Sequence, residues 1–217
     1  MNLDMNVING LAALVLLAAF VVVASSRMQA MVRTFALQSL ALGLLALAIA
    51  YYTGLSHIYV VAALTLALKA YVIPRILAYV MVRIKVEREV DPMLKIPTSL
   101  LVCGGLAVLA YYITEPLIQS ADAITRNVLT FSLAVVLIGL FVMVSRRKAM
   151  TQVIGLLMME NGLFMAAISI TYGMPLIVEL GVFFDVLVAV LIMGVFAFRI
   201  NRTFDTMDTS FLRRLRD

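Results

Sequence analysis

The sequence predicts an all-α membrane protein, built as a polytopic bundle of transmembrane helices, and three observations support this fold class. Hydrophobic residues make up 64% of the 217 residues and charged residues only 13%, and the mean hydropathy is +1.09. Apolar segments of about 20 residues, the length that a helix needs to cross a bilayer, recur along the chain. Charges, Gly and Pro separate these segments, so the helices should be joined by short loops.

The apolar segments define seven predicted spans. The segment before the first span contains Asp4 and no positive charge, so we interpret this span as a retained helix and not as a cleaved signal peptide. The seven spans cover residues 6–25, 33–53, 57–82, 97–114, 124–144, 150–171 and 175–199.

The distribution of Lys and Arg predicts the orientation of the bundle. These residues collect on cytoplasmic loops. All but three of the 17 fall in the loops after the first, third and fifth spans and in the C-terminal tail; the exceptions are Lys69, Arg75 and Arg126. The pattern predicts that the N-terminus lies outside and the C-terminus inside. It also explains the net charge of +5 without nucleic acid, because the basic residues form no single face.

A weak internal repeat divides the predicted bundle into three parts. The segment "SRMQAM" at 26–31 aligns with "SRRKAM" at 145–150, and the same offset superimposes Gly43 on Gly162. We therefore expect a parallel 3+1+3 arrangement, of the kind found in some transporters. Its parts are a three-helix repeat at 1–96, a linker helix and loop at 97–123, and a three-helix repeat with a cytoplasmic tail at 124–217.

Ionisable side chains at the middle of the spans are the main candidate functional residues. The helical rise places Glu160 and Asp185 each ~15 Å inside the bilayer and Lys69 ~18 Å inside, close to the midplane of a core ~30 Å thick. An ionised group there is costly, so these side chains should face one another, a partner or water. An apolar site disfavours the charged forms of acids and bases, which favours proton exchange. We predict a proton path through these three residues, with Glu179 nearer the outer surface.

Other polar residues are candidates for a supporting role. Asn161 and Gln38 are amides that can join neighbouring helices. Arg75 is expected to snorkel or to face a partner, and His57 begins a span near the membrane surface. A structural alternative stays open for the charged residues of the midplane, which could form only an ion pair that fixes the register of the helices.

Metal and haem sites have too few conventional ligands in this sequence. Cys103 is the only cysteine and His57 the only histidine. Zinc sites, cysteine-ligated iron–sulfur clusters and haem pockets each need a larger set of such ligands. Any redox chemistry is therefore expected in other subunits.

The polar motifs of the chain resemble component E of hydrogenase-4, a membrane subunit of formate-hydrogenlyase-type complexes. The motifs are "MENG", "VELGVFFD", the tail "RTFDTMD" and the segment "LALKAYVIPRIL" at 66–77, with its K-x-x-x-x-P pattern. The last three spans are also similar to subunit K of respiratory complex I, which carries a glutamate in each of two helices. Asp185 matches one of these positions. Leu157 occupies the other, and Glu160 follows three residues later on the same helix face.

The resemblance implies a non-catalytic subunit in the membrane arm of a group 4 [NiFe] hydrogenase-like complex of the cytoplasmic (inner) membrane. It implies no cofactor in this chain, and a [NiFe] centre and iron–sulfur clusters in peripheral partner subunits. Antiporter-like membrane subunits, a quinone-site-type membrane subunit and lipids are the other expected partners. The transported ion is H⁺ or Na⁺.

Three alternatives compete with this hypothesis. The chain could be a passive scaffold of the same kind of complex. It could be a stand-alone transporter like the SWEET sugar carriers, although neither repeat contains the Pro-Gln pair of that family. A retinal protein also has seven helices, but its Schiff-base lysine belongs in the last span, which has none.

Overall fold

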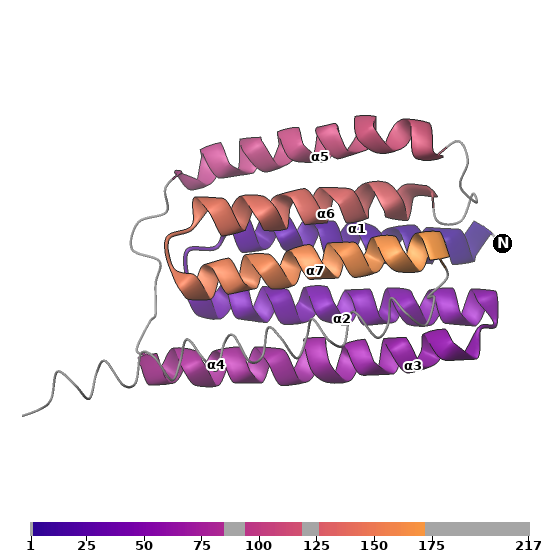
Figure 1. Cartoon of the computed structure of the whole chain (residues 1–217), viewed down its shortest axis with the longest axis horizontal. Coiled ribbons are helices and arrows are strands. Elements are labelled where there is room, and N and C mark those ends of the chain that lie inside the picture. The colour runs from indigo at the N-terminus through magenta and orange to yellow at the C-terminus, as the bar shows by residue number, and fades with distance from the viewer. Residues whose placement is uncertain (1, 85–93, 119–125, 172–217) are drawn as a thin grey trace, which may run out of the picture.

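The computed structural model describes residues 2–84, 94–118 and 126–171, and the regular structure in these ranges is entirely helical. In chain order the elements are α1 (Asn2–Ala24), α2 (Met28–Thr53), α3 (Ser56–Thr65), the π-helix η1 (Leu66–Val72), α4 (Ile73–Ile84), α5 (Ile96–Ile118), α6 (Arg126–Ser145) and α7 (Ala149–Thr171). Because α3, η1 and α4 follow one another without a break, we call them together the third helix (Figure 1).

Six helices in the described ranges are long and apolar enough to cross a membrane. They cover Met5–Ala24, Met28–Thr53, Ile58–Val82, Ile96–Pro116, Asn127–Ser145 and Ala149–Ile170. The chain is thus a helical membrane protein, all-helical over its described residues, and six of the predicted spans are confirmed as helices. The seventh predicted span, 175–199, lies outside the described residues.

The start of the second span differs from the prediction. The sequence predicts that this span begins at residue 33, but α2 begins at Met28, so Arg33 lies inside the helix. Its side chain is exposed. A long arginine side chain can lie along the helix surface while its charged end reaches water, so an arginine near the end of a span does not have to end the helix.

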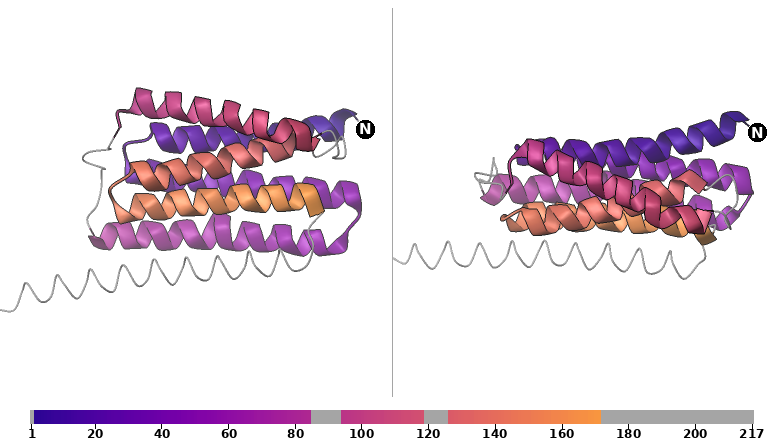
Figure 2. Two further views of the ribbon diagram at one scale, coloured as in Figure 1. Left: turned by 45° about the horizontal axis from the view of Figure 1, so that its top comes forward. Right: turned by 90° about the horizontal axis from the view of Figure 1, so that it is seen from above.

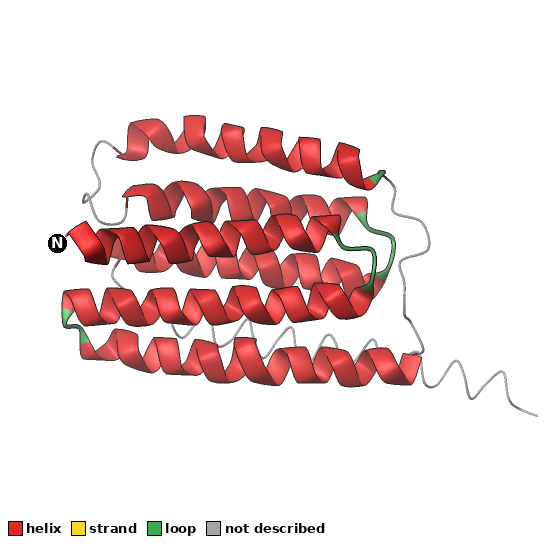
Figure 3. Ribbon diagram, turned by 180° about the vertical axis from the view of Figure 1, so that it is seen from behind, coloured by secondary structure: helices red, strands yellow, loops and turns green. Residues whose placement is uncertain are grey.

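Four helices form the centre of the described bundle. α6 packs on α7 and on α1, and α2 packs on α1 and on α7. α5 flanks this core along α6, and the third helix flanks it along α2 on the opposite side (Figures 1 and 2). Short connections join α1 to α2, α2 to α3 and α6 to α7 (Figure 3).

Gly54 makes the tight turn between α2 and α3 possible. Its φ of 69° lies in the left-handed region, where a side chain would be strained. Its backbone N–H donates to the Ala50 carbonyl oxygen at 2.9 Å and so satisfies one of the free carbonyls at the end of α2. The third helix can therefore start directly after this turn and run back along α2.

Two glycines bring the backbones of α6 and α7 into contact. A Cβ atom at Gly139 would lie 2.6 Å from the Met159 nitrogen, and one at Gly162 would lie 2.8 Å from the Val136 nitrogen. Small residues allow this approach, and helices in a bilayer associate largely through such close packing because lipid is as apolar as their side chains. The contacts fix the middle of α7 against α6.

The glycines that the predicted repeat aligns pack against different neighbours. A Cβ atom at Gly162 would meet Val136 and Ser132 of α6. At Gly43 it would instead meet the side chain of Leu66, which belongs to η1. The sequence identity at these positions therefore does not reflect a shared packing role, and the 3+1+3 arrangement stays a prediction.

Substitution of Gly139 by Ala should destabilise the bundle. The new Cβ atom would displace the backbone of α7, and overpacking of this kind costs about 1–3 kcal/mol. Thermal unfolding of the purified chain in detergent, followed by circular dichroism, would measure the loss. The matched control is Gly105→Ala on α5, where a Cβ atom would meet nothing within 4 Å. Equal unfolding midpoints for the two variants would contradict the close contact.

Candidate functional site

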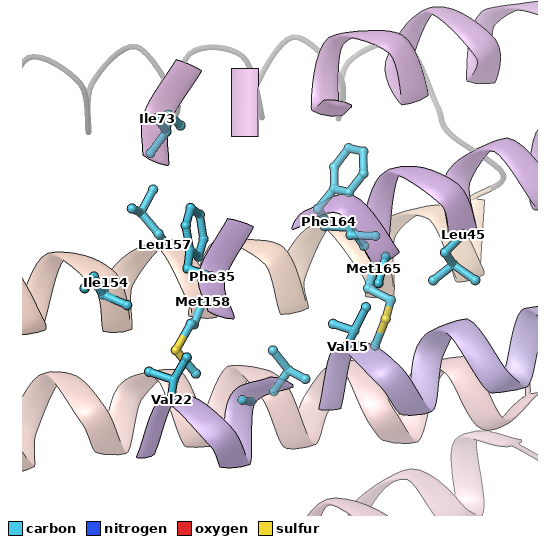
Figure 4. Close-up of a cluster of buried hydrophobic side chains, with 14 of the residues drawn as sticks. Val15, Val22, Phe35, Leu45, Ile73, Ile154, Leu157, Met158, Phe164 and Met165 are labelled. Atoms are coloured by element: carbon cyan, nitrogen blue, oxygen red, sulfur yellow. The ribbon is translucent and has the colours of Figure 1, made fainter. Parts of the chain in front are cut away.

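The middle of α7 presents two apolar faces with a polar residue on each. Leu157 and Phe164 point toward the third helix, whereas Met158 points toward α1 (Figure 4). Residues three or four positions apart share a helix face. Glu160 therefore belongs to the face that meets the third helix, and Asn161 to the face that meets α1 and α2.

Glu160 and Lys69 form a buried ion pair between α7 and η1. Lys69 Nζ donates a hydrogen bond to Glu160 Oε1 at 2.8 Å, and the side chains of Lys69 and Glu160 are only 2% and 8% exposed. The ammonium group also lies 5.4 Å from the centre of the Phe164 ring, which attracts cations through its π-electrons. The structure thus brings together two of the three residues that the sequence places at the midplane.

Each member of the pair depends on the other for charge compensation. Two unit charges ~4 Å apart attract by ~4 kcal/mol at an effective dielectric constant of ~20, whereas burial costs several kcal/mol for each ion. Glu160 Oε2 is also buried, and it has no hydrogen-bond partner among the described residues. This oxygen has lone pairs that can accept a proton or a further hydrogen bond.

Lys69 is held by an irregular piece of helix. It lies in the π-helix Leu66–Val72, and the Ile73 N–H donates to the carbonyl of Leu68, five residues earlier, as the π pattern requires. Pro74 follows at once and has no N–H to donate. A π turn holds more residues than an α turn, so it rotates the side chains that follow. Such segments are rare and occur frequently at functional sites.

Amide hydrogen bonds join α7 to α2 and α1 beside the ion pair. Asn161 Nδ2 donates to Ser39 Oγ at 3.2 Å and to Gln38 Oε1 at 3.4 Å, and Gln38 Nε2 donates to the Val15 carbonyl oxygen at 3.1 Å. All three polar side chains are buried. These contacts fit the packing role predicted for amides between membrane helices. Together, these side chains and the ion pair form a buried polar cluster of five residues, which are Lys69, Glu160, Asn161, Gln38 and Ser39.

The other predicted site residues do not join the buried polar cluster in the described structure. Arg75 is exposed on α4, and its guanidinium lies 3.9 Å from the centre of the Tyr71 ring. His57 lies in the first turn of α3, and its side chain is outside the described part of the chain. Asp185 and Glu179 also lie outside the described residues, so their roles stay predictions.

Arg146 is a buried residue that the sequence does not single out. It connects α6 to α7, is 3% exposed, and donates from Nη2 to the Val23 carbonyl oxygen at 2.7 Å. A cation that binds a carbonyl in the last turn of a helix is stabilised by the helix dipole. In the sequence, Arg146 is the first of three consecutive basic residues, and nothing in their order marks it as the buried one.

The buried polar cluster offers proton exchange more readily than metal binding. It contains one carboxylate and one ammonium group, together with two amides and a hydroxyl that can orient them. Among the residues that the structure describes, no group of three or more His, Cys, Asp or Glu side chains is arranged to hold a metal ion. Cys103 of α5 is buried as a free thiol.

Comparison with known proteins finds relatives that match almost the whole chain. The uncharacterised protein Rv0085 of Mycobacterium tuberculosis is 38% identical over 202 residues, which cover 93% of this chain and 92% of that protein. Hydrogenase-4 component E of Escherichia coli K12 is 24% identical over 210 residues, 97% of either chain, and so is hydrogenase-4 component E of Shigella flexneri. No protein-family model matches the chain, and no solved structure matches it at a significant level.

Removing one partner of the ion pair should destabilise the protein more than removing both. Lys69→Met or Glu160→Met leaves an uncompensated buried charge, which costs about 3–5 kcal/mol, whereas an apolar replacement of both residues is often close to neutral. We expect the double variant to regain most of the unfolding midpoint that each single variant loses in detergent. The control pair is Lys95→Met with Glu115→Met, both at exposed positions. Additive losses at Lys69 and Glu160 would contradict the coupling.

Proposed function

We infer that this chain, which belongs to the family of the mycobacterial protein Rv0085, is a membrane subunit of a hydrogenase-4-like complex and relays protons inside the membrane. The chain is also a distant homologue of hydrogenase-4 component E, which supports the assignment to such a complex. The observation that carries the relay is the buried ion pair of Lys69 and Glu160 at the middle of two membrane-spanning helices.

An ion pair of this kind suits a relay because one proton changes the state of both groups. A proton that binds Glu160 removes its negative charge, and the Lys69 ammonium then loses the charge that compensates it. The two opposite charges attract by ~4 kcal/mol at an effective dielectric constant of ~20. This exceeds the free energy of moving one charge across a membrane potential of 100 mV, which is ~2.3 kcal/mol. The pair can therefore respond to, or drive, charge movement across the membrane.

The proposed path continues into the seventh predicted span. Asp185 would supply an acid at the depth of Glu160, and Glu179 one nearer the outer surface. We propose the proton over Na⁺ as the ion, because the ammonium group of Lys69 on Glu160 Oε1 repels a metal cation at the same carboxylate. A proton instead neutralises that carboxylate by a covalent bond.

The proposed topology follows the sequence pattern. The chain would cross the cytoplasmic (inner) membrane seven times, with its N-terminus outside and its C-terminus inside. Residues 1–96 and 124–217 would form parallel repeats on either side of the linker 97–123.

Redox chemistry belongs to other subunits in this proposal. Peripheral subunits would hold the [NiFe] centre and the iron–sulfur clusters, and antiporter-like and quinone-site-type membrane subunits would lie next to this chain. The name of the distant homologue, a component of hydrogenase-4, supports a multisubunit assembly. From the resemblance of the last three predicted spans to subunit K of complex I, we also propose a place in the membrane arm.

A passive scaffold in the same complex is the second candidate. The amide bonds of Asn161 and Gln38, and the bond from Arg146 to α1, join helices and have no evident part in proton movement. If Lys69 and Glu160 only fix the register of η1 and α7, translocation does not depend on whether Glu160 can ionise. The two candidates therefore differ in one measurable property.

Glu160→Gln separates relay from scaffold because glutamine keeps the size of the side chain and can still accept the hydrogen bond from Lys69, but cannot carry a proton. In the purified complex reconstituted in vesicles, we expect redox turnover to persist and most of the translocation per turnover to be lost. Glu160→Asp, which keeps a carboxylate, should retain part of it. Asp185→Asn should act in the same direction as Glu160→Gln.

Glu115→Gln provides the matched control, since Glu115 is exposed near the end of α5. It should leave both turnover and translocation unchanged. Normal assembly with full translocation in the Glu160→Gln complex would refute the relay and support the scaffold.

A further inference from the structure

Arg75 places a charge on the outer surface of a membrane-spanning helix. It lies seven residues before Val82, the end of the span Ile58–Val82, so its Cα atom is ~10 Å inside that end. Its side chain is exposed. Among the described residues, no carboxylate pairs with it, and its guanidinium lies over the ring of Tyr71.

The contact with Tyr71 directs the guanidinium toward the centre of the bilayer. Tyr71 precedes Arg75 by one helical turn and lies next to the middle of the span. Long side chains on a helix lean toward its N-terminal end, and Arg75 follows this rule. The nearer membrane surface lies in the opposite direction. The geometry is therefore the reverse of snorkelling, in which the charged end of the side chain approaches the headgroups.

A guanidinium at this position requires an anion that lipid does not supply at that depth. Arginine is among the most costly side chains to expose to hydrocarbon near the middle of a helix. The Tyr71 ring offers a cation–π contact but no negative charge. Lipid phosphates lie at the membrane surface, so the anion at this depth is the carboxylate of another membrane-spanning helix.

The helix that compensates Arg75 is separate from those around the buried polar cluster. Lys69 is 2% exposed and meets Glu160 of α7, whereas Arg75 is exposed on another side of the third helix. A helix that presents an acid to the buried polar cluster is therefore not placed to present one to Arg75.

We propose that this face docks a membrane-spanning helix of a partner subunit, which presents an Asp or Glu to Arg75. The Arg75 face consists of Tyr71, Val72, Arg75, Ala78, Tyr79 and Val82, all of them exposed. Ala78 leaves room beside Arg75 for the close approach of another helix. The inference rests on the proposed function in placing the chain within a complex and in placing Asp185 of the seventh predicted span at the buried polar cluster. It does not depend on whether these groups carry protons.

A photo-crosslinking amino acid at Tyr71 tests the docking in the intact complex in native membranes. p-Benzoyl-phenylalanine keeps an aromatic ring at this position. We expect an adduct with a membrane-spanning peptide of another subunit that contains Asp or Glu. Adding Arg75→Gln should lower the yield of this adduct at least ~10-fold, because loss of one partner of a buried charge pair weakens binding by that factor or more. Arg75→Lys, which keeps the charge, should lower it less.

The same probe at Tyr112 of α5 is the control, since Tyr112 is 65% exposed and lies on a different helix. Its adducts should not respond to Arg75→Gln. At Tyr71, an adduct with lipid alone, with a second copy of this chain, or with residues 172–217 of the same chain would overturn the proposal. An unchanged yield with Arg75→Gln would also overturn it. The yield of these adducts does not depend on the outcome of the Glu160→Gln experiment, so the two proposals are tested independently.

Discussion

A charged side chain in hydrocarbon has no water to solvate it, so Lys69 and Glu160 depend on each other. Both lie at the middle of their helices, and their hydrogen bond of 2.8 Å joins parts of the chain that are 91 residues apart. In the described bundle the third helix packs mainly on α2, not on α7. The long side chains of the ion pair therefore bridge the distance between η1 and α7.

Two further sets of contacts hold Glu160 at the depth and rotation that the pair needs. The close approach at Gly139 and Gly162 fixes α7 against α6, and the bonds from Asn161 to Gln38 and Ser39 fix it against α2. These contacts leave α7 little freedom to turn without breaking a buried hydrogen bond or separating two backbones. For the proposed relay, this rigidity means that a proton arriving at Glu160 meets a carboxylate held in one place.

Sequence could predict six of the spans and the inward position of Lys69 and Glu160, but not which helices meet. Spans follow from local apolar length, and an inward position follows from the cost of charge in lipid. Helix neighbours depend on the shapes of small residues, which hydropathy does not describe. Pro74 indicates an irregular backbone near Lys69, yet the π-helix over Leu66–Val72 also depends on tertiary contacts. Arg146 lies in a basic run in which every member has the same expected cytoplasmic position.

The three cations Lys69, Arg146 and Arg75 are compensated in different ways. This difference helps to distinguish a subunit of a complex from an independent carrier. Lys69 pairs with a carboxylate of the same chain, and Arg146 binds a carbonyl at the end of α1. Arg75 pairs with no carboxylate among the described residues, and its guanidinium lies over the Tyr71 ring, toward the bilayer centre. In a stand-alone transporter, the helices that the structure describes would leave this guanidinium facing lipid. In a subunit of a complex, a neighbouring subunit can cover the Arg75 guanidinium and pair with it. The Arg75 face therefore favours both the relay and the scaffold over an independent carrier.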